Sequence, residues 1–181
     1  MNITTLEWTK QTDYGNEISV MIFSTMVYYK SCLFLVNGLG PLYYELKLYR
    51  YCFDIREWHI VSELSGKGRG FVSGIIYNEY FYIFSGGNGK SSGDFSEYIV
   101  RVNLDDDNYR FEEMTLVDKI SIIYFGLTIN DDLGYIFGGY SEKNNVFTNE
   151  LFSVNLQNGL FSLISKRFET PEKDCKHRCL L

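Results

Sequence analysis

The densest group of metal-ligating residue types lies near the carboxyl end of the sequence, where Asp174, Cys175, His177 and Cys179 fall within six residues. Structural zinc sites combine a Cys-x₂₋₄-Cys pair with a second pair elsewhere in the chain. The remaining cysteines lie far away, near the start of the sequence. We therefore expect residues 167–181 to form a polar tail that holds no metal.

Catalytic chemistry has few residues to draw on, because His59 and His177 are the only histidines. His59 follows Trp58 on a predicted outer strand, and no Ser or Cys nucleophile stands beside it in a recognisable motif. The sequence predicts that the protein is not an enzyme and carries no cofactor and no metal.

Two glycine-rich stretches could be mistaken for phosphate-binding loops: residues 86–89 (GGNG), and Gly66, Gly68 and Gly70. A phosphate-binding loop leads from a strand into a helix N-terminus. Both stretches instead connect one predicted strand to another. Turn geometry explains these glycines better than anion binding does.

The amino-terminal segment MNITTLEWTKQTDYGNE is polar and acidic and does not look like a secretory signal. The longest apolar stretch, Ile18 to Tyr29, has 12 residues, well short of the roughly 20 that span a bilayer. We expect a cytoplasmic protein without membrane contact. The four cysteines, Cys32, Cys52, Cys175 and Cys179, are then expected to be free thiols.

The composition favours strands. Of 181 residues, 17% are aromatic, 45% are hydrophobic and none is Ala, the best helix former. The net charge of −6 and the lack of any basic cluster argue against a nucleic-acid partner. We predict an all-β fold.

A repeat with a period of about 50 residues organises the chain. Three apolar runs end in small, turn-forming residues: CLFLVNG, YFYIFSGG and LGYIFGG. Their last residues, Gly38, Gly87 and Gly139, are 49 and 52 residues apart. An apolar strand and a tight turn precede each run, and two further strands follow it. Each unit is therefore predicted to be a four-stranded antiparallel meander.

The repeats divide the chain into five parts. We assign residues 1–17 to a strand of a preceding unit and its loop, 18–64, 65–115 and 116–166 to three units, and 167–181 to the tail. The extra strand is placed at LEWTK, residues 6–10. Residues 81–84 and 122–125 are apolar at every position, which indicates sheets covered on both faces. With no helices to cover them, such sheets must stack on one another, as the blades of a β-propeller do.

These features resemble kelch repeats: a diglycine closes the second strand, an apolar residue and Asp end the third, and an aromatic residue opens the fourth. The resemblance covers about residues 24–165, and the second and third units carry degraded copies of the apolar–Asp pair. It implies structural roles for Gly38, Gly86, Gly87, Gly138, Gly139, Phe53, Asp54, Trp58, Phe111 and Phe161.

Three blades and one strand do not close a propeller, which needs 4 to 8 blades. The chain is then a piece of a longer propeller, or self-associates to complete a ring, or receives the missing blades from a partner protein. Of these three, the sequence favours a piece of a longer propeller.

The long connections of a meander all fall at one end, where binding residues usually sit on a rigid scaffold. We expect a protein partner of unknown identity to bind at this end. The candidate residues are Lys67, Arg69, Lys90, Asp94, Phe95, Glu142, Lys143, Asn144 and Phe147. The alternative function, implied by the kelch resemblance alone, is a fragment of an enzyme similar to galactose oxidase or a sugar isomerase.

Overall fold

The computed structural model describes residues 4–9, 14–16, 18, 21–36, 45–65, 70, 72–84, 98–116, 122–141 and 144–165. All regular structure among these residues is β, as the composition predicts. Apart from one parallel pairing, neighbouring strands are antiparallel.

Three large sheets follow one another along the chain. Sheet 1 contains β2 (Thr25–Tyr29), β3 (Cys32–Val36), β4 (Glu45–Cys52) and β5 (Glu57–Ser65). Sheet 2 contains β6 (Ser73–Tyr77), β7 (Tyr80–Phe84), β8 (Tyr98–Asn103) and β9 (Phe111–Thr115). Sheet 3 contains β11 (Gly126–Asn130), β12 (Leu133–Phe137), β15 (Leu151–Asn155) and β16 (Phe161–Ser165).

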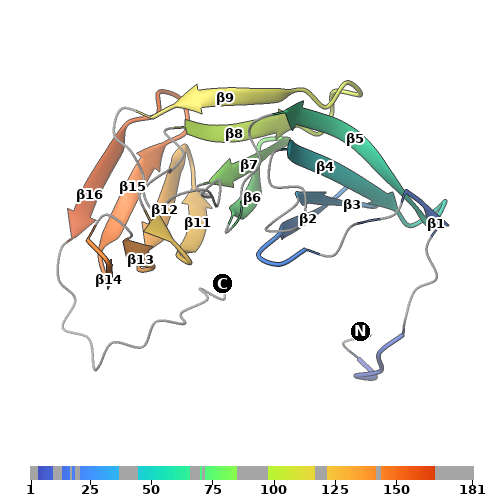
Figure 1. Cartoon of the computed structure of the whole chain (residues 1–181), viewed down its shortest axis with the longest axis horizontal. Coiled ribbons are helices and arrows are strands. Elements are labelled where there is room, and N and C mark those ends of the chain that lie inside the picture. Colours follow the sequence, from blue (N-terminus) through green and yellow to red (C-terminus); the bar gives the residue numbers. More distant parts are fainter. Residues whose placement is uncertain are drawn as a thin grey trace.

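The sheets lie around an open arc, with β2, β6 and β11 on its inside and β5, β9 and β16 on its outside (Figure 1). A small fourth sheet is formed by β10 (Ile122–Ile123), β13 (Tyr140–Ser141) and β14 (Val146–Phe147). The long connection predicted in the third unit is therefore partly ordered as a hairpin.

The three large sheets are built on one pattern. A short turn joins the first two strands of each, and in sheets 1 and 2 both turn residues have positive φ, as at Asn78 and Glu79. The residue after the third strand donates its backbone N–H to the second turn residue's carbonyl. This bond recurs as Phe53 to Ser31, Leu104 to Glu79 and Leu156 to Asp132. The predicted unit of four meandering strands is confirmed.

The aromatic residue that opens the fourth strand also occupies one register position. Trp58 pairs with Tyr51, Phe111 with Val102 and Phe161 with Val154. Phe111 and Phe161 pack against the apolar core between their own sheet and the preceding one. Trp58 packs instead against Tyr51, its partner on β4.

Two apolar cores hold the arc together. Core A lies between sheets 1 and 2 and includes Phe34, Val36, Phe81 and Ile83. Core B lies between sheets 2 and 3 and includes Tyr82, Phe84, Ile136 and Val154. Consecutive residues of β7 thus enter different cores, which is why Phe81 to Phe84 are apolar and buried at every position.

Polar contacts join the sheets at the end where the short turns lie. The Tyr29 hydroxyl donates to Asp105 at 2.9 Å, and the Lys30 ammonium lies 2.6 Å from the same carboxylate. Tyr77, at the equivalent position of sheet 2, donates to Asp132 of sheet 3 at 3.4 Å. The hydrogen bond from Lys30, with that from Tyr29, lowers the pKa of Asp105. Because the contact of Lys30 with Asp105 is exposed, it contributes little to stability.

The amino-terminal strand differs from the prediction. Leu6 to Thr9 form no strand, and Trp8 is 81% exposed. The strand found instead is β1 (Tyr14–Gly15), which pairs in parallel with the outer edge of sheet 1. The Asn16 side chain extends this contact by accepting a hydrogen bond from the Ile60 N–H at 2.9 Å. An edge strand needs only unpaired backbone groups as partners, so no side-chain pattern marked its place.

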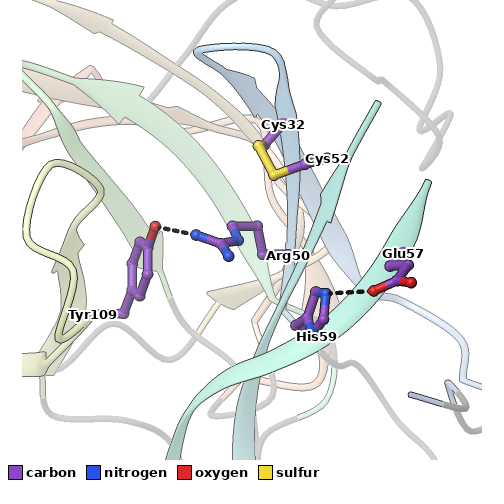
Figure 2. The surroundings of a disulfide bond; sticks show 6 residues. All are labelled: Cys32, Arg50, Cys52, Glu57, His59 and Tyr109. Atoms are coloured by element: carbon purple, nitrogen blue, oxygen red, sulfur yellow. Dashed lines mark hydrogen bonds and ion pairs between the residues drawn. A yellow bond between two sulfur atoms is a disulfide. The ribbon is translucent and has the colours of Figure 1, made fainter. Parts of the chain in front are cut away.

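The prediction of free thiols is wrong for Cys32 and Cys52, which form a disulfide (Figure 2). The two residues face each other across β3 and β4, with their Cα atoms 4.2 Å apart. Their pairing depends on the register of strands joined by a long connection, which the sequence does not reveal. The expectation of free thiols followed from the expected cytoplasmic location, and the disulfide does not favour that location.

The disulfide should stabilise the protein by about 3 kcal/mol, because it closes a loop across a sequence separation of 20 residues. We expect the double variant Cys32→Ser/Cys52→Ser to lose about that much unfolding free energy in urea. Reduced wild-type protein serves as the control and should match the double variant. Alkylation of Cys32 and Cys52 in unreduced, unfolded protein would contradict the disulfide.

Gly138 and Gly139 follow β12 with φ of 67° and 100°. This is the left-handed backbone expected of the diglycine, whereas Gly38, Gly86 and Gly87 lie outside the described residues. A Cβ on Gly139 would lie 2.6 Å from the Ile123 carbonyl oxygen, but one on Gly138 would lie 3.4 Å from its nearest neighbour. The second glycine is therefore required by both conformation and space.

Replacing Gly139 by Ala should cost about 2 to 4 kcal/mol, from left-handed strain and overpacking together. Gly138→Ala is the matched control and should cost about 1 kcal/mol from backbone strain. Urea unfolding of the two variants measures the difference. Equal losses would show that the contact with β10 is not what requires a glycine.

Candidate functional site at the long-connection end

The two ends of the sheets differ in how the chain reverses. Short turns follow the first and third strands of each large sheet, and the described strand ends that lead into the long connections lie at the opposite end. The described part of this long-connection end consists of residues 21–24, 70, 72, 122–125, 138–141 and 144–150.

Two exposed aromatic side chains meet at the inner side of this end. Phe23 lies shortly before β2 and Tyr124 shortly before β11, so the two residues lead into sheets 1 and 3. Their ring centroids are 5.5 Å apart in an edge-to-face arrangement. Both residues have positive φ, which turns the backbone sharply before each inner strand. Phe23 and Tyr124 are each still 44% exposed, and Ile22, next to Phe23 in the sequence, is 53% exposed.

The hairpin of β13 and β14 adds a second apolar group. Val146 and Phe147 are both exposed on β14. The Phe147 ring packs against Tyr140 on the opposite strand, with centroids 5.0 Å apart. The Tyr140 hydroxyl donates to the side chain of Asn145, which has the positive φ of a turn residue. The aromatic pair and this hydrogen bond hold the hairpin in shape.

The structure places two of the predicted binding residues at this end, and both are exposed: Asn144 and Phe147. The other seven fall outside the described residues: Lys67, Arg69, Lys90, Asp94, Phe95, Glu142 and Lys143. Their placement remains a prediction.

Sequence reasoning missed Ile22, Phe23, Tyr124 and Val146. Ile22 and Phe23 belong to an apolar run that continues into β2, and Tyr124 belongs to the apolar run 122–125, which predicts a sheet covered on both faces. Tyr124 instead occupies a bend between β10 and β11. A run of apolar residues does not predict these exposed positions, because periodicity does not show where a strand is interrupted.

His59 lies on the outer strand β5, as predicted. Its Nε2 atom is 3.3 Å from the carboxylate of Glu57, and both side chains are partly exposed (Figure 2). In the described part of the chain, no three His, Cys, Asp or Glu residues come together as metal ligands. Asp174, Cys175, His177 and Cys179 lie outside that part. The geometry places the His59 side chain beside Glu57 on the outer strand of sheet 1.

The chain matches no protein-family model, and no curated protein matches it in sequence. Over the described ranges there is no helix long and apolar enough to cross a membrane.

Proposed function

We propose that the chain is a non-enzymatic protein-interaction module, a kelch-like partial propeller that binds a protein partner through its long-connection end. The observation that carries this proposal is that two groups of exposed apolar residues lie at that end: Ile22, Phe23 and Tyr124 in one, and Val146 and Phe147 in the other. Clustered apolar side chains of this kind are typical of interaction surfaces.

The arrangement of the sheets supports the propeller interpretation. Sheets 1, 2 and 3 share one strand order and one set of turn hydrogen bonds, and they pack face to face through cores A and B. Their inner strands β2, β6 and β11 also lie next to one another in that order. Blades of a propeller have this relation to each other.

The physical form of the surface suits a peptide or protein ligand. Aromatic residues supply large contact areas with few rotatable bonds, and such residues dominate binding energy at interfaces. Phe23, Tyr124 and Phe147 are already oriented by ring contacts, so binding orders them at little further cost. Charged residues predicted at the same end, such as Lys67 and Arg69, would form its polar rim.

A displayed library of random peptides, with the purified chain as bait, tests the proposal. We expect enriched peptides with apolar or aromatic residues, and Phe147→Ala should weaken their binding by about tenfold or more. The matched control is Ile55→Ala, because Ile55 is similarly exposed, at 53% against 47%, but lies in a short turn at the opposite end. Ile55→Ala should leave the affinity unchanged.

The proposal would be abandoned if the enriched peptides bound both variants as tightly as the wild-type protein. Enrichment that Ile55→Ala abolished would move the binding surface to the short-turn end.

A further inference from the structure

The arc has two outward faces that its own described sheets do not cover. We define the first end face as the surface of sheet 1 that points away from sheet 2, with Met26, Tyr28, Leu33 and Leu35 on its inner half. We define the second end face as the surface of sheet 3 that points away from sheet 2, with Thr128, Leu133, Tyr135 and Leu151.

The first end face carries the residue positions that are buried inside the arc in the other two sheets. Leu33 and Leu35 are equivalent to Phe81 and Ile83 of sheet 2, which are fully buried in core A. In sheet 3 the position of Leu35 is taken by Ile136, which is fully buried in core B. Trp58 likewise corresponds to Phe111 and Phe161, the aromatic residues that pack on these cores. This face therefore has the pattern of one that packs on another sheet.

The second end face also carries residue positions that are buried inside the arc in the other two sheets. Leu133 and Tyr135 occupy the positions that Cys32 and Phe34 hold in sheet 1, where both side chains enter core A. In sheet 2 the position of Tyr135 is taken by Tyr82, which is 4% exposed in core B. The two faces that would meet across the opening of the arc are thus the same two kinds of face that meet in cores A and B.

The open part of the first end face is its inner half. Tyr51, on β4, is already 4% exposed, and its ring packs against Trp58 with centroids 5.1 Å apart. On β2, by contrast, Met26 is 54% exposed and Tyr28 is 63% exposed. Large exposed side chains on one face of an inner strand leave apolar area to be covered.

We propose that a second copy of this chain covers both end faces, with the second end face of each copy packed on the first end face of the other. The equivalent positions argue for this occupant, because every copy brings both halves of the contact already used in cores A and B. Two such junctions join three sheets from each copy into a ring of six, within the 4 to 8 that close a propeller. This inference builds on the propeller-type arrangement proposed above, but it does not involve the partner surface.

The test is the mass of the purified chain by light scattering over a range of concentrations. We expect a species of twice 21.1 kDa. Tyr28→Lys blocks the first end face and Tyr135→Lys blocks the second, and each should weaken dimerisation roughly 30-fold or more, as loss of an interfacial hot spot does. Ile55→Lys is the matched control and should leave the dimer intact. Thr128→Lys replaces Tyr135→Lys if circular dichroism shows that the latter does not fold.

A mixture of the two blocked variants tests the pairing of unlike faces. The Tyr28→Lys chain retains the second end face and the Tyr135→Lys chain retains the first, so one of the two junctions can still form. Native mass spectrometry should find a mixed dimer that is weaker than the wild-type dimer and stronger than either variant dimer.

Four results would overturn the proposal. They are a folded wild-type monomer at all concentrations, a series of larger species without a defined dimer, a dimer that only one of the two blocked variants weakens, and variants that do not recombine on mixing. Because all substitutions lie away from the long-connection end, peptide binding there separates this failure from failure of the proposed function.

Discussion

Burial of apolar side chains on both faces of a sheet is the constraint on which this structure depends. A strand exposes alternate residues on opposite faces, so an apolar run such as β7 commits its sheet to two separate cores. The chain places no helix over its sheets in the described residues. Each sheet is therefore covered by another sheet, and the arc of Figure 1 is the result. The end faces and the long-connection end both follow from this stacking.

Much of the fold could be predicted from the sequence because its signals are local. A tight turn between two apolar runs defines a hairpin, and a period near 50 residues repeats that hairpin three times. The residues after the third strands, such as Leu104, occupy the predicted places because the same backbone hydrogen bond recurs there. The structural role of Gly139 could also be predicted from the sequence. A positive φ and a close approach of neighbouring backbone both favour glycine at this position.

What the sequence did not reveal depends on register and on interruptions of strands. The Cys32–Cys52 disulfide needs two strands with a long connection between them to align to the residue. The strand β1 pairs with the edge strand β5 through backbone groups, so its side chains carry no pattern that predicts the pairing. At the candidate site, Tyr124 looked like a core residue because the break between β10 and β11 leaves the apolar pattern unchanged. Of the predicted binding residues described, Asn144 and Phe147 are exposed, and their connection folds into the hairpin of β13 and β14.

Sheet 2 is covered on both faces, by cores A and B, and hydrogen exchange of its backbone amides measures that cover most directly. In dilute protein, the amides of Phe81 to Phe84 in β7 should exchange most slowly and only through global unfolding, because both cores must open to release them. The amides of β16, at the outer edge of sheet 3, should exchange through local opening and much faster. Equal protection of β7 and β16, or faster exchange in β7, would contradict the stacking of the three sheets.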